Sequence, residues 1–349
     1  MITQINISKK KIEKMDKMRL IHRNENKEKM DSEYTSFSSF NYKNYMLFGN
    51  KKGEVEIYDF NNHNDSSNEV KYKLLLRIKV LDDEVKNICE LDEDLFAVSY
   101  RKNIIKIVKC NDNITNYSII QTINLDDYDD VNINSMISFS SQEKRHFLCI
   151  ATKQSIVIYK SNKIPKCFYA PDNENNEDNL TFELYKTIEL FTPVNCLIKA
   201  DNKYLVCSCP NEDSIKFFDI TKDFNEEANI DDINITNGSN IFTLIPNDNN
   251  LIVACNDGLK FISIKLKKIY KSFNLGYKIL SIDMINENNI VCCCSEGKKN
   301  LINQYEINNN NVEKISQKKN KNNDEIWKLQ TINDKIFFID NQKIINFLN

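Results

Sequence analysis

The sequence predicts an all-β protein, and three observations support this prediction. A unit made of a turn, an apolar run, a polar turn and an alternating run recurs seven times along the 349 residues. β-branched and aromatic residues fill the apolar runs, which is typical of strands. The 3.6-residue periodicity of amphipathic helices is absent. Because the chain has only 6 Gly and 5 Pro, we expect Asn and Asp to form its turns.

Two copies of the unit are clearest, because their second halves alternate between apolar and polar residues: Lys43–Phe60 and Asn202–Ile220. Weaker copies are Asp94–Lys109, His146–Lys160, Asn250–Ile264, Asn289–Ile307 and Lys335–Leu348. Equivalent positions near the end of the unit are Tyr58, Val108, Tyr159, Phe218, Ser263, Tyr305 and Phe347. They are separated by 50, 51, 59, 45, 42 and 42 residues, enough for about four strands per unit.

A repeat of this length predicts a seven-bladed β-propeller of four-stranded antiparallel blades, because one small sheet is stable only when neighbouring sheets cover its faces. The innermost strands are predicted at Tyr34–Phe40, Val85–Leu91, Val131–Phe139, Val194–Ala200, Ile241–Ile245, Ile279–Ile285 and Ile326–Ile332. Outermost strands include Lys73–Val80 and Leu180–Leu190. The blades are expected at residues 34–82, 83–127, 128–190, 191–236, 237–275, 276–324 and 325–349.

The last blade is one strand short within its own stretch of sequence, because only Leu348 and Asn349 follow Phe347. An unpaired strand edge invites aggregation, so another segment is expected to pair with it. Residues 18–23, within the N-terminal segment 1–33, are the predicted donor, and Ile2–Ile7 is the alternative. The ring is therefore expected to be closed by an N-terminal strand that completes the last blade.

The repeat resembles that of the WD-repeat family, whose blades carry a small-residue strand, a polar turn and an apolar strand ending in Trp-Asp. The matching runs are EDSIKFFD at Glu212–Asp219 and GEVEIYD at Gly53–Asp59, where Phe or Tyr stands in place of Trp. The sequence departs from the family pattern in two ways. It has no Gly-His pair, and its single tryptophan, Trp327, lies on a predicted inner strand.

This resemblance implies a non-catalytic scaffold or adaptor, a rigid disc that presents loops to protein partners or peptides of a larger complex. In that family the binding face is commonly built from turns that enter the inner strands and turns that join the second and third strands. The candidate partner-binding residues on that face are Tyr100, Arg101, Lys102, Lys153, Tyr277, Lys278 and Trp327. Arg, Tyr and Trp are enriched at binding hot spots, although a core role fits Trp327 equally well.

Insertions add two further candidate segments. Ser161–Asn179 lengthens the third blade, and its Phe168 and Tyr169, followed by acidic residues, form a possible docking loop for a basic partner. In the sixth blade, Asn308–Asp324 carries clustered lysines. One interpretation is that these lysines bind phosphates or acidic lipid head groups. The alternative is that they belong to a solvated loop.

Composition and charge exclude several classes of protein. A total of 47 Lys and Arg against 50 Asp and Glu gives a net charge of −3, which argues against general nucleic-acid binding. The sequence has no run of 18 apolar residues and no secretory signal, so we expect a cytoplasmic protein, with the nucleus as the alternative. The eleven cysteines are therefore expected to be reduced core residues. No spacing of Cys and His completes a metal site, and no cofactor or obligate homo-oligomer is expected.

Two other functions compete with the scaffold. A propeller that binds phosphoinositides and is recruited to membranes would need an adjacent basic pair, for which Lys267-Lys268 and Lys298-Lys299 are the nearest substitutes. A propeller enzyme would need a catalytic group, but the three histidines, His22, His63 and His146, have no nucleophile beside them in the sequence. The sequence therefore predicts that the protein is not an enzyme.

Overall fold

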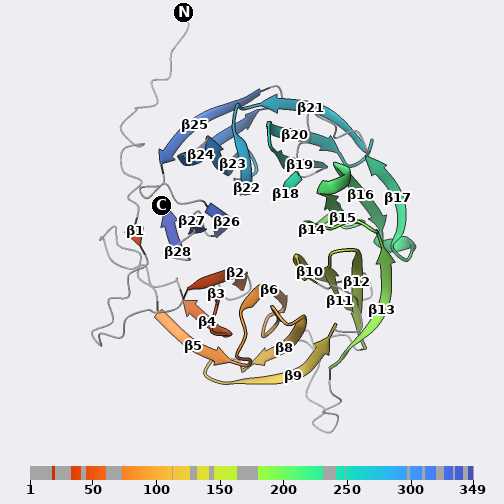
Figure 1. Cartoon of the computed structure of the whole chain (residues 1–349), viewed down its shortest axis with the longest axis vertical. Coiled ribbons are helices and arrows are strands. Elements are labelled where there is room, and N and C mark those ends of the chain that lie inside the picture. Colours follow the sequence, from red (N-terminus) through yellow and green to blue (C-terminus); the bar gives the residue numbers. More distant parts are fainter. Residues whose placement is uncertain are drawn as a thin grey trace, which may run out of the picture.

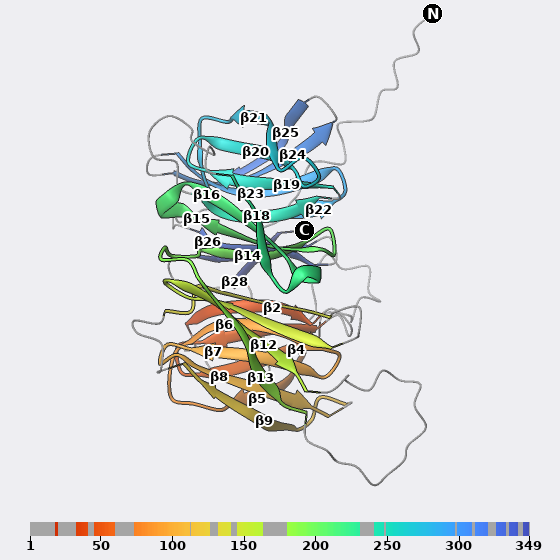
Figure 2. The ribbon, with the colours of Figure 1, turned by 90° about the vertical axis from the view of Figure 1, so that its right-hand side faces the viewer.

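The computed structural model describes residues 18–19, 33–40, 45–59, 73–111, 113–125, 132–140, 145–162, 180–230, 241–247, 249–296, 299–308, 311–319, 326–332, 335–340 and 345–348. Within them the chain forms seven four-stranded antiparallel sheets, arranged as blades around a central axis (Figure 1). Turned by 90°, the ring is seen edge-on as a thick disc (Figure 2). The predicted all-β, seven-bladed propeller is confirmed.

The strands follow one another from the inside of each blade to its outside. Blades 1 to 3 contain β2 (Tyr34–Phe40), β3 (Tyr45–Asn50), β4 (Glu54–Asp59), β5 (Lys73–Lys79), β6 (Val85–Asp92), β7 (Leu95–Tyr100), β8 (Ile104–Cys110), β9 (Tyr117–Asn124), β10 (Ser135–Ser140), β11 (His146–Ala151), β12 (Ser155–Ser161) and β13 (Phe182–Glu189). Blades 4 and 5 contain β14 (Cys196–Ala200), β15 (Tyr204–Cys209), β16 (Ser214–Asp219), β17 (Asn225–Ile230), β18 (Ile241–Asn247), β19 (Asn250–Cys255), β20 (Gly258–Ser263) and β21 (Lys268–Asn274).

Blades 6 and 7 contain β22 (Lys278–Asn286), β23 (Asn289–Glu296), β24 (Lys299–Asn308), β25 (Asn311–Lys319), β26 (Ile326–Ile332), β27 (Lys335–Asp340) and β28 (Ile345–Leu348). Two short 3-10 helices, η3 (Pro210–Glu212) and η4 (Ile220–Lys222), form turns of blade 4. No helix in the described part of the chain is long and apolar enough to cross a membrane.

Strand direction alternates within each blade, so the connections alternate between the two faces of the disc. Turns that join second and third strands, and connections from one blade to the next, lie on one face, which we call the upper face. Turns that join first and second strands, or third and fourth strands, lie on the opposite face, which we call the lower face. The predicted partner-binding turns therefore share the upper face.

The core lies between neighbouring blades. All six residues of β7, β11 and β15 are buried, because both faces of these second strands are covered. One cluster joins Leu91 and Ile107 of blade 2 to Ile150 and Val157 of blade 3. Such strands need apolar residues at every position rather than at alternate ones. Nine of the ten described cysteines are buried and all ten are free, as expected for cysteines that serve as small core residues.

A β-bulge recurs where the third and fourth strands of blades 1 to 6 pair. The register shifts at Ile57/Tyr58, Ile107/Val108, Ile158/Tyr159, Phe217/Phe218, Phe261/Ile262 and Gln304/Tyr305. Five of these shifts include the position aligned from the sequence. In blade 5 the structural equivalent is Ile262 rather than Ser263, so the sequence alignment of that blade was wrong by one residue.

The N-terminal strand β1 (Met18–Arg19) closes the ring. It is the fourth strand of blade 7 and pairs with β28, Met18 opposite Phe347 and Arg19 opposite Asn346. Residues 20–23 of the predicted closing strand and the alternative Ile2–Ile7 lie outside the described residues. The neighbouring inner strands of blades 7 and 1 also meet, where the Gln330 amide donates to Ser39 Oγ at 3.3 Å.

Candidate protein-interaction face

The turn between β7 and β8 presents Arg101 and Lys102 on the upper face, where both are exposed. Two backbone N–H groups fix this turn against the preceding connection: Arg101 donates to the Glu84 carbonyl at 3.0 Å and Lys102 to the Asp83 carboxylate at 2.7 Å. Tyr100, which was predicted to contact a partner, is instead a core residue. Its side chain is only 1% exposed and packs in the core between blades 1 and 2, so it cannot contact a partner directly.

The turn between β11 and β12 presents Lys153, which is also exposed. The buried Thr152 shapes this turn, since its Oγ1 accepts the Ser155 N–H at 3.0 Å and donates to the Ser155 carbonyl at 2.9 Å. The lysine is thereby held on the upper face at the tip of a well-defined turn. The turn that carries Lys153 joins β11 to β12 in blade 3, and the turn that carries Arg101 joins β7 to β8 in the neighbouring blade 2.

Phe191 is the residue of this face that the sequence reasoning missed. Its side chain is 84% exposed, the highest value among the large exposed apolar residues of the described chain. Its φ of 57° lies in the left-handed region, which costs a residue with a Cβ about 1–2 kcal/mol. The backbone N–H groups of Leu190 and Phe191 both donate to the Gln154 carbonyl, at 2.8 and 3.1 Å, and join this connection to the turn that carries Lys153.

Two other large apolar residues of the described chain have positive φ, Ile114 at 50° and Phe224 at 56°. Both are buried, so packing offsets their backbone strain. Phe191 has no comparable burial, although its neighbours Leu190 and Thr192 are buried and anchor the loop. A strained backbone that holds an aromatic ring in solvent indicates a functional surface. No local sequence signal distinguishes Phe191 from the buried Phe224.

Tyr277 and Lys278 lie where the connection from blade 5 enters β22 of blade 6, on the same face, but blades 4 and 5 separate them from Lys153 and Phe191. Tyr277 is half-buried, with Lys314 Nζ 5.7 Å from its ring centroid, while Lys278 is exposed. The backbone of Trp327 lies on β26, and its side chain lies outside the described residues, as do Phe168 and Tyr169. Arg101 and Lys102 of blade 2, Lys153 of blade 3 and Phe191 of the connection from blade 3 to blade 4 therefore share the upper face, and we call them the candidate interaction patch.

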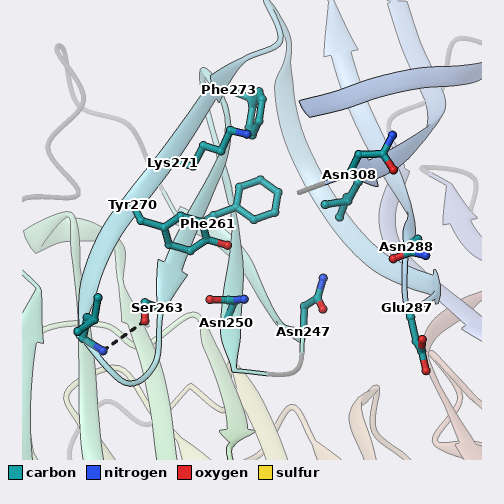
Figure 3. A pocket seen from close by; sticks show the side chains of 12 residues that line it. Asn247, Asn250, Phe261, Ser263, Tyr270, Lys271, Phe273, Glu287, Asn288 and Asn308 are labelled. Carbon is teal, nitrogen blue, oxygen red and sulfur yellow. Dashed lines mark hydrogen bonds between the residues drawn. The ribbon is translucent and has the colours of Figure 1, made fainter. Parts of the chain in front are cut away.

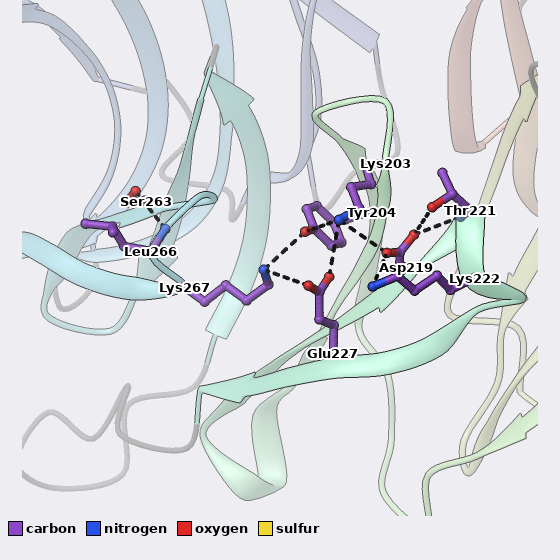
Figure 4. Close-up of polar contacts among 9 residues, drawn as sticks. All are labelled: Lys203, Tyr204, Asp219, Thr221, Lys222, Glu227, Ser263, Leu266 and Lys267. Atoms are coloured by element: carbon purple, nitrogen blue, oxygen red, sulfur yellow. Dashed lines mark hydrogen bonds and ion pairs between the residues drawn. The ribbon is translucent and has the colours of Figure 1, made fainter.

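The lysine pairs considered for lipid binding are differently placed. Lys267 lies on the lower face, where its ammonium group contacts the Tyr204 hydroxyl at 3.2 Å and the Glu227 carboxylate at 3.7 Å (Figure 4). The Tyr204 hydroxyl and then Lys267 hold the pKa of Glu227 below its ordinary value. Lys267 therefore joins blade 5 to blade 4 rather than projecting as a free cation. Lys298 and the side chain of Lys299 lie outside the described residues.

Asp219, one of the two Asp residues that end a matching run of the repeat, belongs to the same network of hydrogen bonds and ion pairs. Asp219 is buried, and its carboxylate accepts hydrogen bonds from the Thr221 N–H at 2.9 Å and the Thr221 hydroxyl at 2.6 Å. Lys203 pairs with it at 3.3 Å (Figure 4). Asp219 thereby caps η4 and fixes the turn between the third and fourth strands. Its role here is structural.

The structure places a serine, a histidine and an aspartate, the residue types of a catalytic triad, close together, which the sequence did not reveal. Ser140 Oγ lies 3.2 Å from His146 Nδ1, and His146 Nε2 lies 3.5 Å from an Asp92 carboxylate oxygen. The hydrogen bond with His146 holds the pKa of Asp92 below its ordinary value. The imidazole is largely buried between the lower-face turns of blades 2 and 3, so it links two blades. We interpret the arrangement as structural, because its contacts join β11 of blade 3 to the end of β6 of blade 2.

Metal-binding side chains do not converge within the described part of the chain: no group of three or more His, Cys, Asp or Glu is placed to hold an ion. Cys207 and Cys209 lie two residues apart on β15, with sulfur atoms 3.9 Å apart. Both lie in the apolar core between blades 3 and 4. The pair is therefore part of the packing.

A family model described as the NUP159/214 beta propeller matches residues 133–345, which is more than half of the chain. The chain belongs to the NUP159/214 beta-propeller family. The matched region begins before β10 and ends at β28, so it covers blades 3 to 7. It includes Lys153 and Phe191, whereas Arg101 and Lys102 precede it.

Solved structures agree with this membership at the level of the fold. A chain of a crystal structure of the mitotic checkpoint complex is similar with a TM-score of 0.64 and 8% identity, over 90% of this chain and 88% of that chain. The WD40 beta propeller domain of Doa1 is similar with a TM-score of 0.61 and 10% identity, over 92% and 94%. The WD-repeat-like fold expected of this NUP159/214-family chain is confirmed. No curated protein matches its sequence significantly.

Proposed function

We propose that this protein is a non-catalytic scaffold of a multiprotein complex that binds protein partners through the interaction patch of its upper face. Propellers of the WD40 and NUP159/214 kinds are generally protein-interaction scaffolds, which supports the general part of the proposal. The observation that carries the specific part is Phe191, an exposed aromatic ring on a strained but anchored loop.

The patch combines an exposed aromatic residue with cationic residues, of which Arg is a type enriched at binding hot spots. The exposed Phe191 lies on a connection hydrogen-bonded to the turn of Lys153, and Arg101 and Lys102 lie on the corresponding turn of the neighbouring blade. Four such residues on adjacent blades suit a partner segment that offers an apolar pocket or side chain together with carboxylates. We infer that the partner is acidic around the point where it contacts the patch.

The proposal is tested by site-specific photocrosslinking in cells, with a photoreactive phenylalanine analogue placed at position 191. We expect discrete crosslinked partners at this position. They should be lost when the protein also carries Arg101→Glu, which reverses a charge of the patch. The matched control places the analogue at position 184, because Leu184 is a 55% exposed residue on the outer strand β13 and lies outside the patch.

Identical crosslinking patterns at positions 191 and 184 would contradict the proposed face. Turnover of a substrate by the purified protein, abolished by Ser140→Ala, would contradict the non-catalytic reading.

A further inference from the structure

A groove of about 500 Å³ lies between blades 5 and 6, away from the interaction patch (Figure 3). Its blade 5 wall comes from β20, β21 and two lower-face turns, and its blade 6 wall from the turn between β22 and β23 and the end of β24. The volume falls within the range of about 300–1,000 Å³ that is typical of ligand sites. We call it the interblade groove.

Tyr270 supplies the exposed aromatic surface of the groove. Its side chain is 52% exposed, whereas the neighbouring Phe261 is only 4% exposed and belongs to the core. The two ring centroids lie 6.2 Å apart, with the ring planes at 65°. Phe261 therefore supports the tyrosine ring from the core, and Tyr270 is the ring that a ligand can cover.

Tyr270 occupies a position that contacts the next blade elsewhere in the ring. It is the extra residue of the β-bulge of blade 5, as Tyr185 is in blade 3 and Glu227 in blade 4. The Tyr185 hydroxyl donates to the Asp223 carboxylate of blade 4 at 2.8 Å, and Glu227 pairs with Lys267 of blade 5 at 3.7 Å. The Tyr270 hydroxyl makes no hydrogen bond to a described residue of blade 6, and the groove lies beside it instead. A ligand in the groove would bridge the two blades where the protein itself does not.

Side-chain amides surround the Tyr270 ring on both walls. Asn247 and Asn250 lie on the blade 5 side, and Asn288 and Asn308 on the blade 6 side (Figure 3). None of these four amide groups hydrogen-bonds to a described residue of the chain. An amide both donates and accepts hydrogen bonds, as a hydroxyl group does. The amides therefore suit a ligand that is rich in hydroxyl groups.

The charges of the groove balance. Lys271 is the one cationic residue of the lining and Glu287 the one carboxylate. The Lys271 Nζ atom lies 4.7 Å from the Phe273 ring centroid, and neither Lys271 nor Glu287 forms an ion pair with a described residue. One charge of each sign favours no charged ligand, whereas an ammonium group donates to hydroxyl oxygens and a carboxylate accepts from hydroxyl groups. The lining thus favours a neutral ligand.

We propose that the interblade groove binds a neutral oligosaccharide, with the apolar face of one pyranose ring stacked on Tyr270 and its hydroxyl groups hydrogen-bonded to the amides of both walls. A pyranose ring combines a face of C–H groups with a rim of hydroxyl groups, which matches an exposed aromatic ring bordered by amides. The site uses no residue of the interaction patch, so it is independent of the scaffold function proposed above.

The test is a microarray of neutral, sialylated and sulfated glycans, probed with the fluorescently labelled full-length protein. We expect binding to neutral glycans, with competition by the same glycan free in solution. Isothermal titration calorimetry with this free glycan then compares the variants. Tyr270→Ala should weaken binding about tenfold through the loss of the stacking surface, and Asn288→Ala about fivefold through the loss of one amide. Tyr270→Phe, which keeps the ring, should retain the binding.

The matched controls are Ile315→Ala, an exposed apolar residue on β25, and Asn195→Ala, an exposed amide on the upper face. Both should bind the glycan as wild type does. Phe191→Ala should also bind it normally, which separates failure of the groove from failure of the interaction patch. The proposal is overturned if no glycan binds, if sialylated or sulfated glycans bind as strongly as neutral ones, or if Tyr270→Ala has the wild-type affinity.

Discussion

Asp283 shows how a single inner-strand residue couples two blades at an energetic cost. Its carboxylate lies on β22 and accepts the backbone N–H of Thr331 on β26 at 2.5 Å and that of Met284 at 2.9 Å. Burial raises the pKa of Asp283 to about 6, and these two hydrogen bonds only partly oppose that effect. The folded state therefore binds a proton more tightly than the unfolded chain, whose Asp pKa is about 3.9.

The stability that Asp283 contributes decreases as the pH rises. The contribution of Asp283 to the free energy of unfolding is largest below about pH 4 and is lost as the pH rises through about 6. Asp283→Asn loses one of the two acceptor oxygens at every pH but cannot ionise. Relative to the wild type, we therefore expect its free energy of unfolding to be about 1–2 kcal/mol higher at pH 7.5 than at pH 4.5.

Urea denaturation at pH 4.5 and 7.5 measures this effect. Asp201→Asn, at an exposed turn position, is the control and should change the free energy of unfolding by less than about 0.5 kcal/mol at either pH. The same difference between variant and wild type at both pH values would show that ionisation of Asp283 does not lower the stability.

At the scale of elements, the connection between β13 and β14 carries Phe191, and a substitution there should reduce partner binding without lowering the free energy of unfolding. Phe191→Gly removes the penalty of a positive φ at a residue whose ring is exposed. Because glycine also adds entropy to the unfolded chain, we expect the free energy of unfolding to stay constant or to rise by up to about 1 kcal/mol. Partners identified by crosslinking from position 191 should nevertheless no longer copurify with this glycine variant.

The matched variant is Phe224→Gly, which changes a residue of similar φ whose ring packs on Phe147 at 5.4 Å and on Phe139 at 6.3 Å. We expect this variant to lose about 3 kcal/mol of stability, as large-to-small substitutions in a core do. Thermal denaturation of both variants tests the contrast. A similar loss in Phe191→Gly would mean that Phe191 holds the fold instead of serving a partner.

At the scale of the whole molecule, ring closure depends on the two-residue pairing of β1 with β28. A chain that begins at Leu20 lacks β1 and exposes the edge of β28. A chain that begins at Met15 keeps β1 but lacks Ile2–Ile7. We expect only the shorter chain to be impaired, with a Tm lower by about 4–8 °C, as for a loss of about 2 kcal/mol in a large domain.

Size-exclusion chromatography with light scattering provides a second readout. The chain beginning at Leu20 should self-associate, because an open strand edge pairs with other chains. The chain beginning at Met15 should behave as the full-length protein does. Impairment of both chains to the same extent would favour Ile2–Ile7, or another upstream segment, as the strand that matters for closure.

The sequence by itself determined the architecture of this protein. Strand period, Asn and Asp turns and the missing last strand are local patterns, so they revealed seven blades, the closing segment and the buried cysteines without any tertiary contact. Trp327 was likewise placed on an inner strand, which β26 confirms.

Only the tertiary structure decided which side chains face solvent and which meet across blades. Tyr100 and Phe191 both lie at the edge of an upper-face turn, yet the first is buried and the second exposed, because the packing of the neighbouring blades differs. The link from Asp92 to His146 and the ion pair of Lys267 with Glu227 also join residues of different blades. Such contacts depend on how one blade is seated against the next, and no local pattern in a single chain encodes that distance.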